Sequence, residues 1–192
     1  MNKKPTPGKV IVIVAPSGAG KTTIAQRLLR EYPRVQFSVS ATTREPRKGE
    51  KDGEDYYFLS EEEFDQKIKN EEFLEWEHYS GNRYGTLRSE VDKLVESGYF
   101  PLLDLEVKGA KNVKHIYGSE AISIFIQPPS MAELKRRLTK RGTEKTKTVE
   151  NRLEEARQEM KSAKDFDYLV VNDDLDIAYN EVKAIIEPFI TD

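Results

Sequence analysis

The sequence predicts a three-layer α/β protein in which helices cover both faces of a parallel central sheet. Two observations lead to this prediction: apolar runs of strand length recur along the chain, and amphipathic segments of helical length separate them. The strand-like runs span residues 10–14, 100–105, 121–126 and 168–171, with 36–39 as a further candidate, and the helical segments span 24–32, 88–97, 107–117, 131–140, 149–164 and 175–189. Parallel sheets of this kind bind ligands at the carboxyl ends of their strands, so we expect the site there.

Composition excludes several classes of function. The chain has 192 residues, 37% of them hydrophobic, and no apolar run approaches the ~20 residues of a membrane span. No secretory signal precedes the first strand, and the lack of cysteine excludes disulfides and thiolate metal sites, so we expect a cytoplasmic protein. Because the net charge is −3, we expect neither nucleic acid nor a membrane as a partner. Monomer and homodimer both remain open.

The first strand-like run leads into a loop that carries glycines and ends in a lysine and two threonines. A buried strand, such a loop and then a helix are typical of a phosphate-binding loop, whose backbone N–H groups surround an anion at the helix N-terminus. The predicted ATP-binding residues here are Ala15, Pro16, Ser17, Gly18, Ala19, Gly20, Lys21, Thr22 and Thr23. The pattern therefore predicts a P-loop NTPase-type core, with an ordinary strand-to-helix turn as the alternative.

Residues in and near this loop predict a magnesium site. Lys21 can reach the β- and γ-phosphates, and the Thr22 hydroxyl can complete the shell of a bound Mg²⁺. Asp104 ends a buried strand near the loop, and we expect it to hold Mg²⁺ through water; a helix-capping role is the alternative. Ala15 stands where the pattern has its first glycine, which a small residue with negative φ can replace.

Two segments interrupt the alternation of strands and helices. Residues 40–86 are polar and aromatic, and a capping box of Ser60 and Glu63 opens a short helix between extended pieces, which predicts a small α+β lobe. Residues 132–163 carry many Lys and Arg on two helices separated at Gly142, the first opened by a second capping box, Ser130 with Glu133. We interpret this segment as a lid that brings cations to phosphates, against the alternative of a solvated helix face. Residues 1–39, 87–131 and 164–192 then form the core.

Residues 38–58, with the sequence SVSATTREPRKGEKDGEDYYF, are the most informative stretch after the loop. They resemble the nucleotide-acceptor segment of guanylate kinases, and residues 72–76, 84–86, 141–144 and 171–175 resemble further motifs of that family in the same order. The resemblance covers nearly the whole chain and is far more specific than the phosphate-binding loop. It implies Mg²⁺-dependent transfer of the ATP γ-phosphoryl group to GMP, and to dGMP, giving ADP and GDP in purine nucleotide metabolism.

The resemblance assigns an acceptor site. The predicted GMP-binding residues are Ser40, Arg44, Arg47, Tyr56, Glu75, Tyr84, Thr86 and Glu106. The two arginines and two tyrosines are donors for the GMP phosphate, because a guanidinium fork matches phosphate oxygens. The carboxylates and hydroxyls would read guanine, whose edge presents an N–H and an amino donor. Turn chemistry at Ser40 and cross-strand pairing at Glu75 and Tyr84 remain the alternatives.

The resemblance also assigns the catalytic residues. Those that would surround the transferring phosphoryl group are Lys21, Arg44, Arg137, Arg141 and Arg152. Asn172 lies in the segment that lines the adenine of ATP. The GMP phosphate oxygen is already anionic, so catalysis needs alignment and charge neutralisation rather than a general base.

The sequence departs from the family pattern at three places. Glu106 stands where Asp is usual, Lys108 replaces a common Gln, and Lys145 and Lys147 lie where acidic residues often follow. Two other functions remain as alternatives: a non-catalytic guanylate-kinase-like interaction module, and a kinase of the same fold that acts on another phosphorylated acceptor. Modules of the first kind tend to lose the loop lysine and the lid arginines, which this chain has.

Overall fold

The computed structural model describes residues 7–79, 81–140 and 146–191. Its central sheet has five parallel strands in the order β2-β7-β1-β8-β9. These strands are β1 (Val10–Val14), β2 (Val35–Phe37), β7 (Phe100–Asp104), β8 (Ala121–Gln127) and β9 (Tyr168–Val171). Because Ile13 pairs with Asp104, the end of β7 and the loop after β1 emerge side by side at the carboxyl edge.

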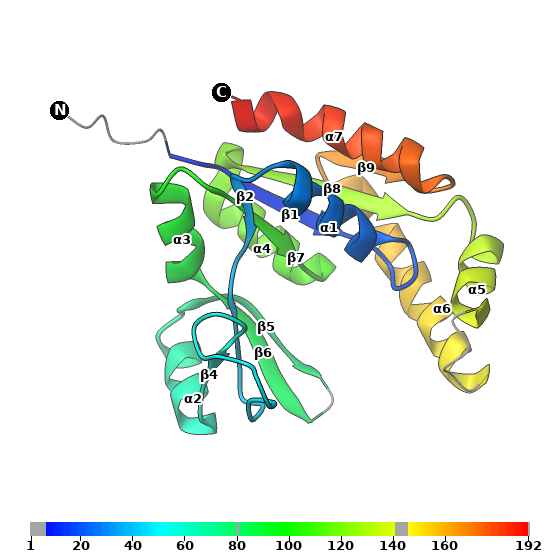
Figure 1. Ribbon diagram of the computed structural model, residues 1–192. Helices are drawn as coiled ribbons and strands as arrows, with labels where there is room; N and C mark the ends of the chain where they lie inside the picture. The colour runs from blue at the N-terminus through cyan, green and yellow to red at the C-terminus, as the bar shows by residue number, and fades with distance from the viewer. Residues whose placement is uncertain (1–6, 80, 141–145, 192) are drawn as a thin grey trace.

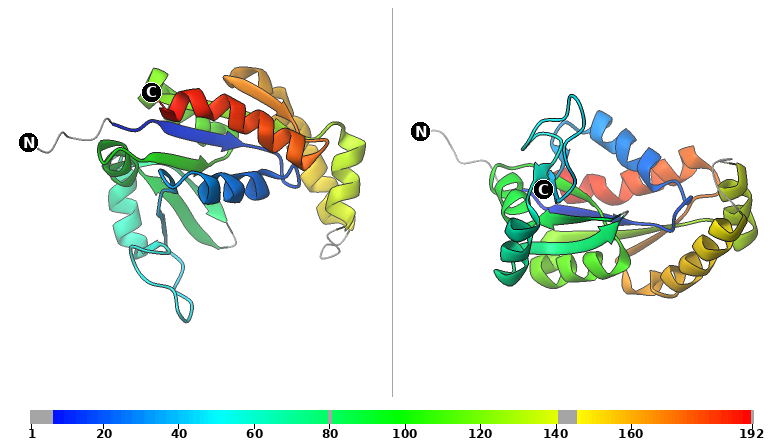
Figure 2. Two further views of the ribbon diagram at one scale, coloured as in Figure 1. Left: turned by 45° about the horizontal axis from the view of Figure 1, so that its top comes forward. Right: turned by 90° about the horizontal axis from the view of Figure 1, so that it is seen from below.

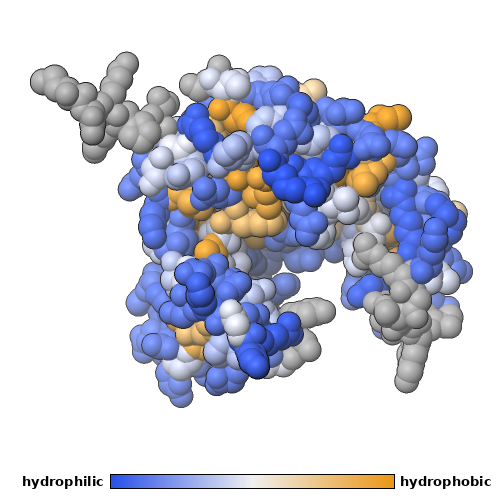
Figure 3. Space-filling view, viewed as in Figure 1, coloured by the Kyte–Doolittle hydropathy of each residue, from blue (hydrophilic) through white to orange (hydrophobic). Residues whose placement is uncertain are grey.

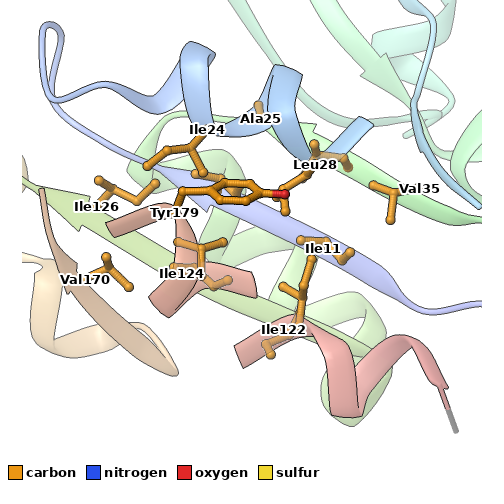
Figure 4. Close-up of a cluster of buried hydrophobic side chains, with 14 of the residues drawn as sticks. Ile11, Ile24, Ala25, Leu28, Val35, Ile122, Ile124, Ile126, Val170 and Tyr179 are labelled. Atoms are coloured by element: carbon orange, nitrogen blue, oxygen red, sulfur yellow. The ribbon is translucent and has the colours of Figure 1, made fainter. Parts of the chain in front are cut away.

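Helices cover both faces of this sheet. Ile11 and Ile13 of β1 pack in a buried cluster with α1 (Lys21–Glu31) and α7 (Leu175–Thr191), which contributes Tyr179 (Figure 4). The valines of β1 face the other way, toward α3 (Arg88–Glu96) and α4 (Val107–Tyr117). Strands buried on both faces are typical of a doubly covered parallel sheet. The predicted three-layer α/β fold is thus confirmed.

A second, smaller sheet has the strand order β4-β3-β6-β5. It is built from β3 (Ser40–Thr42), β4 (Tyr57–Phe58), β5 (Phe73–Tyr79) and β6 (Asn82–Leu87), with α2 (Glu61–Lys69) between β4 and β5. The expected capping box is present: the Ser60 hydroxyl accepts from the Glu63 N–H and the Glu63 carboxylate accepts from the Ser60 N–H. Ala41, Phe64 and Leu87 form a small core of its own.

Two helices, α5 (Met131–Lys140) and α6 (Thr146–Lys161), pack on each other through Leu134, Leu138 and Leu153. Figure 1 and the two views of Figure 2 show this pair beyond one end of the central sheet and the second sheet below the other end. The capping box predicted before α5 is only half formed. Ser130 Oγ accepts from the Glu133 N–H, but the Glu133 carboxylate accepts from Arg136 and Arg137 instead.

Several element boundaries differ from the predicted ranges by one to three residues, and two of these differences have a clear structural cause. β2 occupies 35–37 rather than 36–39, because the chain leaves the central sheet there and enters β3 at Ser40. α6 ends at Lys161, and a 3₁₀ turn, η2 (Ala163–Asp165), seats Ala163 and Phe166 in the cluster on the α4 face. A second 3₁₀ turn, η1 (Gly118–Glu120), precedes β8. Among the described residues, no helix is long and apolar enough to cross a bilayer.

Candidate active site

The loop after β1 has the backbone that a phosphate-binding loop requires. Gly18 and Gly20 have φ values of 90° and 98°, a region that residues with a side chain rarely adopt, and α1 begins at the next residue, Lys21. The N–H of Ala19 donates to the Pro16 carbonyl at 2.9 Å, which closes the turn. Ala15 is buried and does not have a positive φ, so its side chain is accommodated where the pattern has glycine.

Asn172, the residue directly after β9, supports this loop. It is 3% exposed, and its Nδ2 donates to the Ala19 carbonyl at 2.7 Å. A Cβ on Gly20 would lie 2.2 Å from that nitrogen, so glycine is required where the two segments meet. The sequence placed Asn172 beside the donor nucleotide but did not show that its amide holds the loop.

Lys21 forms an ion pair with Asp104 across the carboxyl edge of the sheet. A cavity of about 750 Å³ lies over this pair, and its walls include the loop, Thr22 and Thr23 on the first turn of α1, and Arg152 of α6. Because free N–H groups and the positive end of the α1 dipole face this cavity, it suits a polyphosphate.

A second cavity, of about 360 Å³, lies between the second sheet and the end of β7. Most of the residues predicted to bind the acceptor line it: Ser40, Tyr56, Glu75, Tyr84, Thr86 and Glu106. Glu77, Asp104 and Glu106 line both cavities, so the two share a wall. Figure 3 shows the surface hollowed between the second sheet and the helices α5 and α6.

Arg44 lies two residues after β3, and a carboxylate of the same loop holds its side chain. One of its guanidinium nitrogens donates to both oxygens of Glu50, at 2.9 and 3.0 Å, and the guanidinium lies 5.4 Å from the Tyr56 ring centroid. The backbone N–H of Arg47 donates to the same carboxylate at 2.7 Å. These contacts lower the pKa of Glu50, chiefly through Arg44. Neither Arg44 nor Arg47, whose side chain is exposed, is among the residues that line the acceptor cavity.

Glu75 is a largely buried carboxylate in the second cavity. It pairs across the strands with Thr86, whose hydroxyl donates to Glu75 Oε1 at 2.7 Å. Burial raises the pKa of Glu75, and the bond from Thr86 opposes that shift. The cross-strand pair and the acceptor role are therefore compatible, because the carboxylate still borders the cavity.

Two further carboxylates near Lys21 were not expected from the sequence. Glu77 of β5 lines both cavities, and Glu159 of α6 lines the first. Burial raises the pKa of both, and the neighbouring Glu106 raises the Glu159 pKa further, to about 7. No local pattern marks either residue, because only the folded chain brings β5 and α6 to the same cleft.

The arginines predicted for phosphoryl transfer take different positions. Arg152 lines the cavity over the loop. Arg137 donates to Glu133 at 2.7 Å and to the Asp173 carbonyl at 3.2 Å, next to Asn172. Arg141 lies outside the described residues.

The predicted magnesium ligands suit a hard cation. Thr22 and the Asp104 carboxylate both border the first cavity and offer oxygen, the ligand type that Mg²⁺ prefers. Within the described residues there is no cluster of three or more His, Cys, Asp or Glu that could hold a metal ion by itself. A site with few protein ligands fits a cation that also binds substrate phosphates.

Comparisons with known proteins agree with the motifs. The family model "Guanylate kinase" matches residues 7–188. The chain is 52% identical to the guanylate kinase of Salinibacter ruber, over 95% of this chain and 97% of that protein, and 46% identical to that of Chlorobaculum tepidum, over 95% and 94%. The crystal structure of guanylate kinase from Anaplasma phagocytophilum superposes with a TM-score of 0.71 and 33% identity, covering 97% of this chain and 88% of that one. The chain belongs to the guanylate kinase family.

Proposed function

We propose that the protein transfers the γ-phosphoryl group of ATP to GMP, giving ADP and GDP. The observation that carries this proposal is the shared wall of the two cavities, with a phosphate-binding loop on one side and a buried carboxylate–threonine pair on the other. Two nucleotides bound there would meet phosphate to phosphate at Lys21. The alternative of a non-catalytic interaction module is not favoured, because the relatives that match are guanylate kinases.

On the donor side, the loop residues and Lys21 would hold the β- and γ-phosphates of ATP. The N–H groups before α1 point at the anion, and the lysine would exchange its contact with Asp104 for one with phosphate oxygens. Asn172 would hold the backbone of the loop through its hydrogen bond to the Ala19 carbonyl. The residues next to Asn172 in the chain would line the adenine of ATP.

On the acceptor side, Glu75 and Thr86 would accept from and donate to the guanine edge, with Ser40 and Glu106 completing the ring of polar groups. Arg44, Tyr56 and Tyr84 would donate to the GMP phosphate. The exposed Arg47 would also donate to this phosphate once the segment after β3 that carries it closes over the bound nucleotide. No residue near this cavity is assigned to the ribose 2′-hydroxyl, so we include dGMP as a substrate.

The chemistry needs no general base, because the attacking oxygen of GMP is already anionic near neutral pH. The protein's contribution is to align donor and acceptor and to neutralise charge with Lys21, Arg44, Arg152, Arg137 and, outside the described residues, Arg141. Bound Mg²⁺, held by Thr22 and through water by Asp104, would supply further neutralisation of the phosphate oxygens.

The two peripheral parts of the molecule would act as moving lobes. We propose that residues 40–86 form the acceptor lobe and 132–163 the lid, on a core of 1–39, 87–131 and 164–192. Closure of both would exclude water from the γ-phosphate, which prevents ATP hydrolysis. The hollow between them in Figure 3 is the space that such a movement would close.

A coupled assay of ADP release tests the function. Purified protein is assayed with ATP, Mg²⁺ and, in turn, GMP, dGMP, AMP, UMP and CMP. We expect turnover with the two guanine nucleotides and a kcat/KM at least about 10²-fold lower with the others, because the buried acceptor groups would stay unpaired. Equal activity with AMP would refute the assignment of the guanine site.

Glu75→Gln sharpens that test, and Glu54→Gln serves as its matched control. Glu75→Gln should lower kcat/KM for GMP by about 10²-fold, since an amide cannot accept both donors of guanine. Glu54 is an exposed carboxylate of the same lobe that pairs with Lys51, so its variant should behave as the parent does.

A further inference from the structure

The strand that carries Glu75 contains a β-bulge immediately before it. In the pairing of β5 with β6, Phe73 lies opposite Leu87 and Glu75 lies opposite Thr86, so Leu74 is an extra residue in β5. Side chains of a strand alternate between the two faces of its sheet, and an extra residue reverses that alternation. Phe73 stacks on Phe64 of α2, on the face away from the acceptor cavity. Without the bulge Glu75 would share that face, so the bulge is what places it in the cavity.

Leu74 is held by the core rather than by the second sheet. Its side chain is 1% exposed and belongs to the buried cluster beneath the central sheet, together with Val113 of α4. The Leu74 carbonyl accepts a hydrogen bond from Asn112 Nδ2, also on α4. The backbone of the extra residue in a bulge lacks its regular hydrogen-bond partner on the neighbouring strand. The Asn112 side chain supplies a partner for the Leu74 carbonyl.

Gly109 lets α4 approach Glu75 closely. A Cβ at this position would lie 2.8 Å from Glu75 Cγ and 2.9 Å from Glu75 Cβ, closer than such atoms approach in real structures. The clash involves the base of the Glu75 side chain rather than its flexible end, so the strand or the rotamer would have to move. Glycine within a helix costs about 0.5–1 kcal/mol relative to alanine, and the room it leaves for Glu75 accounts for its presence here.

We propose that Gly109 and Asn112 of α4 are positioning residues for guanine recognition: they fix the bulge at Leu74 and thereby the place of the Glu75 carboxylate. This inference rests on the proposed function, because it takes Glu75 as the group that reads guanine. It makes base recognition a property of the core, whereas Arg44, which would bind the phosphate, is held by Glu50 of its own loop.

The test compares Gly109→Ala and Asn112→Ala with Lys111→Ala on the same helix. Lys111 is exposed and pairs with Asp165, so its variant is the control. With GMP we expect Gly109→Ala to lower kcat/KM about tenfold or more, mostly through KM, because small misplacements of a substrate contact are costly. Asn112→Ala should have a smaller effect of the same kind. The KM for ATP should not change in either.

The readout that separates positioning from general damage is the ratio of kcat/KM for GMP to that for IMP, which lacks the 2-amino group that Glu75 would bind. This ratio should fall in both α4 variants and stay at the parent value in Lys111→Ala. In Gly109→Ala the clash with Glu75 opposes the helix propensity that alanine gains, about 0.5–1 kcal/mol, and thermal unfolding measures the net change in stability. If Gly109→Ala proves unstable, Asn112→Ala carries the test alone, because alanine is tolerated at an exposed helix position.

The outcomes distinguish this inference from the proposed function. If the parent does not prefer GMP to IMP, the assignment of Glu75 to guanine fails and the inference fails with it. If the parent prefers GMP and Glu75→Gln abolishes that preference, but both α4 variants keep the parent ratio and KM, the function stands and the positioning role is overturned.

Discussion

The phosphate-binding loop lies on one side of the cleft, and the part of the second sheet next to the acceptor cavity, together with the loop that carries Arg44, lies on the other; we call the latter the acceptor edge. Different forces support the two sides. The loop grows out of β1, and its Ala19 is buried in the main hydrophobic cluster and bonded to Asn172. The edge that carries Arg44 is held by ion pairs, Arg44 with Glu50 and the buried Arg83 with Asp65, around a small core. We therefore expect the donor side to be the more rigid of the two, because hydrophobic burial holds it, and the acceptor edge to adjust more readily when a phosphate binds, because ion pairs hold it.

The largest expected effect is at the donor side. Lys21→Met should lower kcat by about 10³-fold, because it removes a preorganised cation from the transferring phosphoryl group. Stability should change little, since the Asp104 carboxylate that loses its partner is 38% exposed. Steady-state kinetics and thermal melts measure both. A variant that keeps turnover within a few-fold of the parent would show that the loop does not hold the reacting phosphates.

At the acceptor edge, Arg44→Ala should lower kcat/KM for GMP by about 10²-fold and leave the KM for ATP unchanged. Arg44→Lys should restore little of this loss, because an ammonium cannot reproduce the planar fork that binds Glu50 and that we propose to bind the phosphate at the same time. If lysine restores full activity, a point charge suffices and the geometry of the Glu50 pair is irrelevant. Initial rates over a matrix of ATP and GMP concentrations separate these outcomes.

Asn172→Ala tests the rigidity of the donor side. The substitution leaves the Ala19 carbonyl without its buried donor, which should cost about 1–3 kcal/mol in the free energy of unfolding. The KM for ATP should rise while the KM for GMP stays the same, because the loop and not the second sheet is affected. Urea denaturation and kinetics check the two parts. An increase in the KM for GMP alone would contradict the view that Asn172 supports the donor side and not the acceptor side.

The smallest effect expected is a pH dependence at Glu159. Its pKa is raised by burial and by Glu106 to about 7, so the folded protein binds this proton more tightly than the unfolded chain does. The stabilisation from the proton is complete below about pH 4.5 and is lost as the pH rises through 7. Glu159→Gln should therefore melt a few degrees above the parent at pH 8, and this difference should shrink toward pH 5. Melting curves across that range measure it, and a constant difference would contradict the assignment.

Local patterns predicted the donor side well because local chain geometry builds it. The strand 10–14, the glycines with positive φ and the helix that begins at Lys21 follow one another within a few residues. The capping box of Ser60 and Glu63 was confirmed for the same reason. The box of Ser130 and Glu133 was half wrong, because two arginines one turn further along the helix compete for the carboxylate.

The acceptor residues were named from a motif resemblance, and local patterns could not have placed them. Glu75 looks like an ordinary strand residue, and its face is decided by a one-residue bulge that no propensity predicts. Glu77 and Glu159 lie far apart in the chain, so their approach to Lys21 appears only after folding. Contacts of this kind depend on how the elements pack, which periodicity does not encode.

By itself the sequence determined the three-layer α/β fold, the phosphate-binding loop and the chemical types of the residues around it. These follow from apolar periodicity and from short-range backbone preferences, both of which act within a few residues. The tertiary structure alone decided that Asn172 holds the loop and that α4 seats Glu75 through Gly109 and Asn112. Those contacts join segments that are distant in sequence, so they exist only once the sheet and its helices have packed.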